Sequence, residues 1–394
     1  MMGNWRIPTI SNVLDDCTKR GVAIDLNRVS ETTTVLQAEQ GSMRAQIIDI
    51  CGEEFSIENQ WQLGVVLFEK LGLRPMCRRE SGYEVDNDYL AEIDHPIIQS
   101  ILDYRSAATS LRCIKEYERT ARNGRVHPAF TISDIGRICT GNPNVQAMPK
   151  PIRSIVAPDQ WCTFVKADWR AMHLRLLAHL SQDPALIGLF ADGRDPFVDL
   201  AAMLFGHDVS EVTAAERSTA KSITYALLYG GRCRSLARRH RLAAEVVQGY
   251  REAFLGRFRG VHRWINRAVK AARRDGFIST ITSRQLSAVG SSAESLDEGT
   301  IINRILQGSE ADLLTEALIK VDSSFRGGGS MICIPIHDEI LVQSYAGWVE
   351  DAMELLTYHM TSVGHDLAVP MSVKVMTGPD WGDLREPSAN EACA

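Results

Sequence analysis

A strand followed directly by a helix is encoded in residues 161–184, WCTFVKADWRAMHLRLLAHLSQDP. Phe164 and Val165 lead an apolar run into Asp168, and leucines recur beyond it at the three- to four-residue spacing of a helix face. This junction places a carboxylate where a strand ends and a helix begins, a common place for ligand chemistry in mixed α/β folds. Taken alone, Asp168 is equally well explained as the N-cap of that helix. A second acidic site later in the chain favours the ligand interpretation.

The second acidic site lies in residues 330–344, SMICIPIHDEILVQS, where two apolar runs flank His337, Asp338 and Glu339. The pattern predicts a hairpin with acidic residues at its turn. Acids at a hairpin tip are common, so this motif alone is weak. Asp168 and Asp338 together are more informative, because two carboxylates on neighbouring strand ends can hold two divalent cations about 3.5–4 Å apart. Oxygen ligands with an anionic substrate favour Mg²⁺.

A helix is predicted between the two acidic sites, in residues 216–231, ERSTAKSITYALLYGG, and the final glycine pair would end it. Two cations and two tyrosines recur at every fourth residue and form one slowly drifting stripe: Arg217, Lys221, Tyr225 and Tyr229. The cations repel each other unless an anion lies between them, and a triphosphate suits the pair, while the tyrosines offer a surface for a base or sugar. The alternative is a surface helix with two buried tyrosines. The surrounding segment 217–274 is rich in arginine and poor in acids, as in a polyanion-binding surface. Together the three segments indicate nucleotidyl transfer.

The composition excludes several other classes of protein. The chain has 394 residues, 45% of them hydrophobic and 23% charged, which is enough for several packed subdomains. Its net charge of −6 gives no indication of a nucleic-acid partner, in contrast to the local arginine excess. The nine cysteines contain no CxxC pair, which fits reduced thiols better than disulfides or a zinc site. Neither a secretory signal nor a run of eighteen apolar residues is present, so we expect a cytoplasmic protein with no membrane partner.

The three segments resemble motifs A, B and C of the family A DNA polymerases, the DNA polymerase I-like enzymes. Motif A corresponds to ADWRAMHLRLLAHLS, motif B to RSTAKSITYALLYG and motif C to IHDE. In addition, GRICTGNPNVQAMP is similar to the family's TGR…PNLQNIP segment, and NRILQGSEADL to its NxxVQGxxADL segment. The resemblance runs in family order through residues 10–384. We therefore identify the chain as similar to the polymerase domain of this family.

The resemblance implies an α+β fold, the right-hand polymerase fold with an antiparallel-sheet palm, helical fingers and a helical thumb. The implied ranges are 1–25 for the first part of the palm, 26–115 for the thumb, 116–190 for the palm with motif A, 191–275 for the fingers with motif B, 276–384 for the palm with motif C, and 385–394 for a C-terminal tail. Helical patterns in 27–52, 58–72 and 95–122 agree with a helical thumb, and Asp94 is the expected N-cap of the last of these helices.

Site residues are implied by position in the motifs. The equivalents of Asp168 and Asp338 bind two metal ions, Mg²⁺ with Mn²⁺ as an alternative, and Glu339 is a further catalytic acid beside them. Arg217 and Lys221 match the residues that hold the incoming triphosphate. Three aromatic residues match positions at the nucleotide: His173, Tyr225 and Tyr229. Seven others match positions that contact primer or template: Arg137, Asn144, Gln146, Arg284, Asn303, Gln307 and His337.

The sequence departs from the family pattern at two positions near the nucleotide. His173 replaces the glutamate of DYSQIELR that blocks a ribose 2′-hydroxyl, which leaves sugar discrimination open. Phe197 stands where the family often has a histidine ligand for phosphate. Because the resemblance starts almost at residue 10, we expect neither a 3′–5′ exonuclease nor a 5′ nuclease domain. A separate processivity or proofreading factor is compatible with that expectation.

The predicted function is template-directed DNA synthesis, in which a primer 3′ end is extended with dNTPs on a DNA primer-template. One alternative is relaxed sugar selection with ribonucleotide incorporation. The related single-subunit RNA polymerases resemble HDS rather than HDE at motif C, so Glu339 favours DNA synthesis. The other alternative is a catalytically silent DNA-binding subunit, against which the presence of both metal acids and both triphosphate cations argues.

Overall fold

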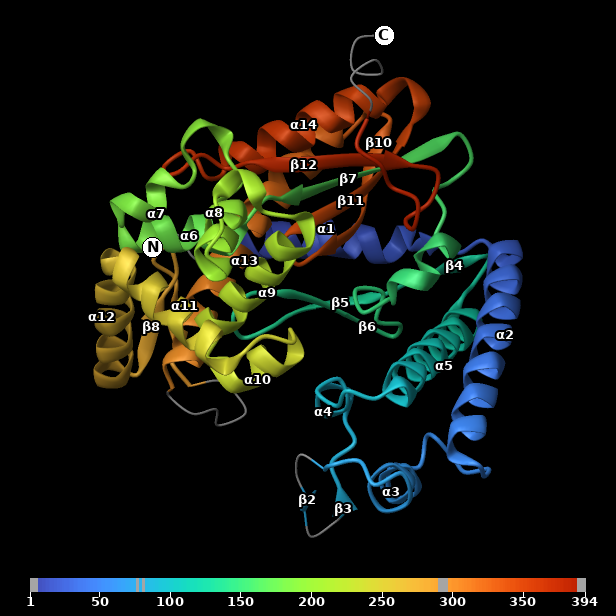
Figure 1. Cartoon of the computed structure of the whole chain (residues 1–394). Coiled ribbons are helices and arrows are strands. Elements are labelled where there is room, and N and C mark those ends of the chain that lie inside the picture. The colour runs from blue at the N-terminus through green and yellow to red at the C-terminus, as the bar shows by residue number, and fades with distance from the viewer. Residues whose placement is uncertain (1–5, 76–77, 80–81, 290–296, 388–394) are drawn as a thin grey trace. The chain divides into compact units, whose positions relative to one another are not determined.

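The computed structural model describes residues 6–75, 78–79, 82–289 and 297–387, drawn as coloured ribbon in Figure 1. The chain forms two compact units. The first consists of residues 1–23, 127–146 and 157–394, and the second of residues 24–126 and 147–156. Within the described ranges no helix has the length and apolar character needed to cross a membrane.

The first unit is built on a four-stranded antiparallel sheet with the strand order β10–β11–β7–β12. The strands are β7 (Cys162–Trp169), β10 (Ser330–Ile336), β11 (Glu339–Tyr345) and β12 (Val373–Gly378). The middle of β7 is buried on both faces, as its continuous apolar run predicts. In the sheet register Asp168 lies opposite Glu339 on one side and Lys374 on the other. The antiparallel sheet expected from the sequence is therefore confirmed.

Helices α1 (Arg6–Arg20), α13 (Glu298–Phe325) and α14 (Val349–Ser362) pack against this sheet. Helix α13 also contacts α1, α14 and three helices from earlier in the chain. Because it is surrounded, even polar side chains on it are buried, among them Glu310 and Asp312. Buried polar groups need hydrogen-bond or ion-pair partners, so the partners of α13 determine much of the local geometry.

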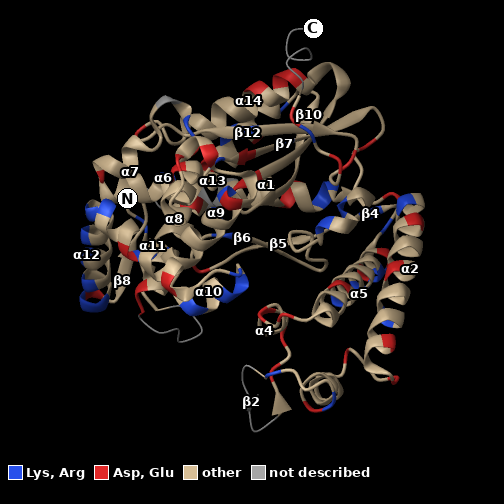
Figure 2. Ribbon diagram, viewed as in Figure 1, with Lys and Arg blue, Asp and Glu red and all other residues tan. Residues whose placement is uncertain are grey.

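The other α-helices of the first unit lie between β7 and α13 in the chain. They are α6 (Met172–Ser181), α7 (Pro184–Gly188), α8 (Pro196–Phe205), α9 (Ala214–Leu228), α10 (Cys233–Arg239), α11 (Ala244–Arg257) and α12 (Arg259–Asp275). Helix α12 shows why they form: Val261, Trp264 and Ile265 are buried on one face, and arginines cover the other. Figure 2 shows Lys and Arg gathered on α10 and α12, where the sequence has its arginine-rich segment. Two short hairpins complete the unit: β5 (Ala129–Ile132) with β6 (Ile138–Gly141), and β8 (Phe277–Ser279) with β9 (Gln285–Ser287).

The second unit is organised by two long helices that pack together, α2 (Leu26–Cys51) and α5 (Pro96–Thr120). Short elements lie between them in the chain: α3 (Gln60–Gly64), a π-helical turn (Val65–Lys70), the strands β2 (Arg78–Arg79) and β3 (Gly82–Tyr83), and α4 (Asn87–Leu90). Their apolar side chains form one core: Ile47, Ile57, Leu63, Leu67, Phe68, Val85, Leu90, Ile97, Ile98 and Ile101.

Helix α5 begins one residue later than its sequence predicts. The cap is His95, whose Nδ1 accepts a hydrogen bond from the backbone nitrogen of Ile97 at 3.3 Å, so the expected cap at Asp94 is wrong. The reason is Pro96 at the first helical position, because a residue that precedes proline is held in an extended conformation. The helix expected in 58–72 is present as α3 followed by the π-helical turn.

The predicted domain ranges stay predictions. Residues 26–115, predicted as thumb, fall within the second unit, whereas the ranges predicted for the fingers and for the motif-bearing parts of the palm fall mainly in the first. The predicted tail lies outside the described residues from position 388 onward.

Candidate active site

The two acids singled out in the sequence lie side by side. Asp168 is near the end of β7, and Asp338 is in the two-residue turn between β10 and β11. The backbone nitrogen of Trp169 donates a hydrogen bond to the carbonyl oxygen of Asp338 at 3.3 Å, which brings the turn next to the strand end. His337 accommodates the tight turn with a φ of 51°. Both carboxylates line a cavity of about 900 Å³ in the first unit.

Burial, with neighbouring negative charge, raises the pKa of both carboxyl groups. Burial is the largest cause for each; the charge of Glu339 adds to it at Asp168, and the charges of Asp168 and Glu310 add to it at Asp338. A divalent cation between the two acids would offset this repulsion. Among the residues that the structure describes, no group of three or more His, Cys, Asp or Glu side chains is arranged to hold a metal ion. The chain thus offers a carboxylate pair, and further oxygen ligands would come from a bound substrate or water.

Glu339, the third acid of the predicted catalytic set, has a different environment. Its Oε2 lies 2.7 Å from Nζ of Lys166, and both side chains are nearly buried. It is absent from the residues that line the cavity. This ion pair joins β11 to β7 next to Asp168, which lies opposite Glu339 in the sheet. A catalytic role for Glu339 stays a prediction.

Helix α9 brings its predicted stripe to the same cavity. The helix begins at a capping box in which Thr213 and Glu216 satisfy each other's backbone nitrogens, and it ends at Tyr229. All four stripe residues line the cavity: Arg217, Lys221, Tyr225 and Tyr229. The two tyrosine rings are stacked with their centroids 6.1 Å apart and an interplanar angle of 3°. The helical spacing predicted from the sequence is therefore confirmed.

The two cations of the stripe differ in their surroundings. Arg217 is paired with Asp195, whose Oδ2 accepts from its Nε at 2.6 Å. Lys221 makes no ion pair with any carboxylate of the described chain and is exposed to the cavity. Phe197, which replaces a family histidine, lies with its ring 5.7 Å from Nζ of Lys221 and edge-on to Tyr225. It therefore gives the cavity an aromatic wall in place of a hydrogen-bond donor.

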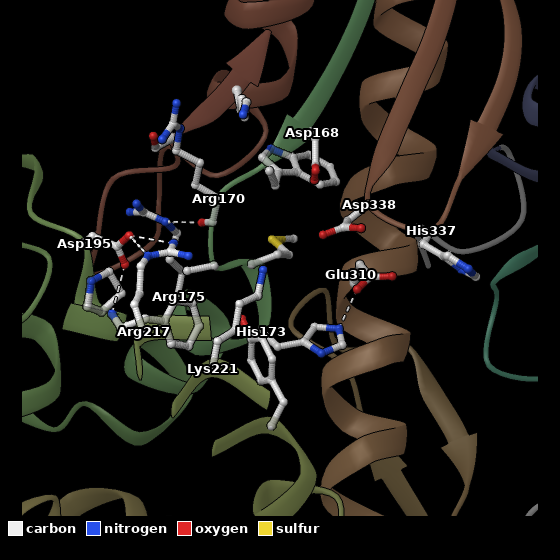
Figure 3. A pocket seen from close by; sticks show the side chains of 18 of the residues that line it. Asp168, Arg170, His173, Arg175, Asp195, Arg217, Lys221, Glu310, His337 and Asp338 are labelled. Carbon is white, nitrogen blue, oxygen red and sulfur yellow. Dashed lines mark hydrogen bonds and ion pairs between the residues drawn. The ribbon is translucent and has the colours of Figure 1, made fainter. Parts of the chain in front are cut away.

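His173 stands between helix α9 and helix α13, as Figure 3 shows from the side of the cavity. Its Nδ1 contacts the hydroxyl of Tyr229, and its Nε2 lies 2.5 Å from Oε2 of Glu310. Oε1 of Glu310 accepts from Nη2 of Arg137 at 2.8 Å. Burial would raise the pKa of Glu310, but His173 and Arg137 together hold it below its usual value.

The predicted DNA-contacting residues divide into two groups. Arg137, Gln307 and His337 line the cavity. The other four do not line it: Asn144, Gln146, Arg284 and Asn303. Three of these have partners in the fold. Asn144 accepts from Thr140 at 2.9 Å, Gln146 donates to the carbonyl of Pro335 at 2.8 Å, and Arg284 donates to Asp312 at 2.6 Å. Oδ1 of Asn303 is buried and has no hydrogen-bond partner among the residues that the structure describes. The roles of all seven at DNA stay predictions.

Comparison with known proteins agrees with this geometry. The sequence profile of DNA polymerase family A matches residues 26–383. The chain belongs to DNA polymerase family A. It is 29% identical over 405 residues to DNA polymerase I of Lactococcus lactis subsp. cremoris, covering 98% of this chain and 46% of that protein. It is 30% identical over 393 residues to DNA polymerase I of Caldicellulosiruptor bescii, covering 95% of this chain and 46% of that protein. The chain thus spans about half the length of these relatives.

A solved structure of the family shares the fold. It is the POL domain of Pol1 from M. smegmatis in complex with DNA primer-template and dNTP. The TM-score is 0.86 and the sequence identity 28%, with 95% of this chain and 70% of that one covered. The α+β polymerase fold expected from the sequence is confirmed.

Several cavity residues of this family A chain were missed by sequence reasoning. Three are charged residues that contact or oppose a predicted site residue: Asp195, Glu310 and Lys374. The others are basic residues at the cavity wall: Arg170, Arg175 and Arg194. Glu310 had a detectable signal, because it follows Gln307 by three residues in a helix and so shares its face. No comparable signal exists for Asp195, because an aspartate before Pro196 is typical of a helix N-cap.

Proposed function

We propose that this chain is a template-directed DNA polymerase that extends a primer 3′ end with dNTPs by two-metal-ion nucleotidyl transfer. One observation carries the proposal: two adjacent carboxylates and a helix with two cations and two tyrosines line a single cavity. The 3′-oxygen of the primer forms a bond with the α-phosphorus of the nucleotide, and the bond to the leaving pyrophosphate breaks. Because the chain covers only half of its curated relatives, the activity of those whole proteins is not transferred to it.

The residues present fit a divalent metal site. Asp168 and Asp338 supply carboxylate oxygens, and their pKa values are raised first by burial and then by neighbouring negative charge, both of which a cation would offset. This donor set suits Mg²⁺, which is commonly bound by one or two carboxylates together with substrate phosphates and water; Mn²⁺ is the alternative. When bound, two such ions activate the primer hydroxyl and offset the charge of the phosphates.

The nucleotide is held by helix α9 and its neighbours. Lys221 and Arg217 bind the triphosphate. Lys221 binds it directly, whereas Arg217 first leaves its ion pair with Asp195. Tyr225 and Tyr229 offer stacked faces to the base, and His173 lies at the sugar. Arg170, Arg175, Arg194 and Lys374 add positive charge around the same cavity.

DNA primer-template is the proposed macromolecular partner. Arg137, Gln307 and His337 contact it from the cavity wall, and the arginines of α10 and α12 add a sequence-independent attraction to phosphate.

Residues 26–115 are proposed as thumb, 191–275 as fingers, and 1–25, 116–190 and 276–384 as palm. A separate processivity or proofreading factor and a cytoplasmic location stay predictions.

Relaxed sugar selection is a second candidate, supported by one observation. The position at which the family's glutamate blocks a ribose hydroxyl is occupied by His173, which here is held by Tyr229 and Glu310. An imidazole ring is also bulky, so the geometry is compatible with exclusion of ribose as well as with its acceptance.

Gel-resolved primer extension with Mg²⁺ tests the proposal. The wild type and the Asp338→Asn variant would be compared with dNTPs and with rNTPs in separate reactions. We expect extension with dNTPs, and a loss of at least about a thousandfold in the variant because one of two metal-binding carboxylates is gone. Primer-template binding, measured by fluorescence anisotropy, should change by less than about threefold, since Asp338 carries no positive charge to phosphate.

Each other outcome has a definite meaning. Full activity of Asp338→Asn contradicts the two-metal assignment. Comparable extension with rNTPs establishes relaxed sugar selection. DNA binding without any extension by the wild type establishes a silent binding subunit.

A further inference from the structure

Glu310 is a buried acid whose two oxygens are both occupied by residues of the cavity. It lies in the middle of α13 and is 3% exposed. Oε1 accepts from Arg137 at 2.8 Å, and Oε2 lies 2.5 Å from His173. A buried carboxylate is strongly unfavourable without such partners. These two contacts therefore stabilise Glu310 and also restrict the positions of Arg137 and His173.

The contact with Glu310 determines how His173 meets Tyr229. The carboxylate of Glu310 keeps a proton on the ring nitrogen beside it, Nε2, whose partner is then Oε2 of Glu310. The other ring nitrogen, Nδ1, contacts the hydroxyl of Tyr229. Burial raises the pKa of Tyr229, so its hydroxyl stays protonated in this contact. The chain Arg137–Glu310–His173–Tyr229 is thus continuous from one residue to the next.

This network joins segments that are far apart in sequence. Arg137 precedes β6, His173 is in the first turn of α6, Tyr229 ends α9 and Glu310 is in α13. His173 lies edge-on to both stacked tyrosines, with ring centroids 6.2 Å from Tyr225 and 5.7 Å from Tyr229. A rotation of the histidine ring would therefore change the shape of the wall on which a nucleotide sugar and base lie.

We infer that Glu310 is a positioning residue for the incoming nucleoside triphosphate: it fixes His173, and through it Tyr229, in the orientation that receives the sugar. The inference rests on the proposed polymerase function and deepens it. In the family's NxxVQGxxADL segment this position has no fixed residue, so the motif itself assigns no role to Glu310. A carboxylate here compensates for the acid that this chain lacks at position 173.

Glu310→Gln is the most direct test, because it preserves size while removing one acceptor. An amide has a single acceptor oxygen, so it can satisfy Arg137 or His173 but not both. We expect the KM for dNTPs to rise and the preference for dNTPs over rNTPs in kcat/KM to fall, each by about tenfold, with a smaller change in kcat. Single-nucleotide insertion kinetics with each nucleotide type measures all three quantities.

Glu316→Gln is the matched control. It is the same substitution on the same helix, at a residue whose ion pair is with Lys320 and which does not line the cavity. We expect wild-type kinetics from it, and thermal unfolding of both variants reports any loss of folded protein. A Glu310→Gln variant that is folded, active and unaltered in KM and sugar preference would overturn the inference.

A double-mutant cycle separates positioning from a general structural effect. His173→Glu alone puts a second carboxylate against Glu310, and the repulsion should lower kcat/KM for dNTPs by about a hundredfold. In His173→Glu combined with Glu310→Gln, the amide can donate to the introduced carboxylate and accept from Arg137. We expect the double variant to be at least about tenfold more active than the product of the two single effects predicts.

The cycle has two contrary outcomes, and they are distinguishable. Additive effects would mean that the two positions do not act together, and would overturn the inference while the polymerase function stands. Absence of dNTP extension by the wild type would instead contradict the proposed function on which the inference rests.

Discussion

Arg217 lies in an ion pair that an incoming triphosphate would have to replace under the proposed function. Both of its bonding nitrogens lie 2.6 Å from Asp195, and the two side chains are 39% and 38% exposed. Exposed pairs of this kind contribute only about 0.2–1 kcal/mol. Under the proposed function, a triphosphate with several charges would therefore displace Asp195 readily, and Asp195 competes with the nucleotide for Arg217.

Asp195→Asn should consequently strengthen nucleotide binding. The amide oxygen can still cap α8, as Oδ1 of Asp195 does by accepting from the nitrogen of Phe197 at 2.9 Å, so the helix should remain intact. Loss of the competing charge should lower the KM for dNTPs by about two- to fivefold, which corresponds to the worth of an exposed ion pair. Steady-state kinetics at low ionic strength measures the change. A raised KM would mean that Asp195 positions Arg217 for binding rather than competing for it.

At the scale of elements, the end of α9 and the start of α13 meet through two glycines. A Cβ on Gly299 would lie 2.5 Å from the backbone of Gly230 and 2.6 Å from the carbonyl carbon of Tyr229. The approach is closer than any side chain allows, and the atoms in the way are backbone. This contact fixes the end of the cation-and-tyrosine helix against the helix that carries Glu310.

Gly299→Ala should therefore be harmful although alanine is the better helix former. Helix propensity favours alanine by about 1 kcal/mol, whereas forcing the two backbones apart costs about 1–3 kcal/mol and displaces Tyr229. We expect a net loss of about 1 kcal/mol in the free energy of unfolding and a loss of kcat/KM for dNTPs of at least about tenfold.

Gly249→Ala is the control for this prediction, because Gly249 is inside α11 and, apart from its own helix backbone and chain neighbours, no described atom lies within 4 Å of an added Cβ. It should increase stability by about 0.5–1 kcal/mol and leave the kinetics unchanged. Urea unfolding and nucleotide insertion, measured for both variants, provide the comparison. Equal behaviour of the two variants would show that the contact between Gly230 and Gly299 does not constrain the site.

The sequence predicted those parts of the site that depend on local pattern. An apolar run before Asp168 and a hairpin around Asp338 were enough to place both acids at strand ends, and four-residue spacing was enough to align Arg217 with Tyr229. It did not predict how Glu339 pairs, because its partner Lys166 lies two residues along the neighbouring strand from the position opposite Glu339, and the sheet register alone brings the two side chains together. A buried ion pair depends on which elements pack together, and no local pattern contains that information.

At the scale of the whole molecule, the chain leaves the first unit and later returns to it. Helix α1 comes before the residues of the second unit, and β10 comes far after them, yet the two elements pack together. Sγ of Cys17 donates to the carbonyl of Ile332 at 3.5 Å, and Arg20 donates to the same oxygen at 2.7 Å. These contacts join positions more than three hundred residues apart, 315 for the cysteine. The first unit is therefore complete only when both ends of the chain have folded.

Two buried cysteines report on this contact. Burial raises the pKa of Cys17 to about 11 and that of Cys333, on β10, to about 12. Since the thiolate is the reactive form and only about one Cys17 in a thousand is ionised at pH 8, both residues should resist iodoacetamide in the native protein. Of the cysteines in the described part of the chain, Cys139 is exposed and should be alkylated first. In increasing urea, Cys17 and Cys333 should become reactive together, over the range in which the fluorescence of the whole protein changes, because one contact protects both. Peptide mapping by mass spectrometry measures the modification at each cysteine. Alkylation of Cys17 at a clearly lower urea concentration than Cys333 would mean that α1 detaches by itself, and that the cavity with Asp168 and Asp338 can exist without α1.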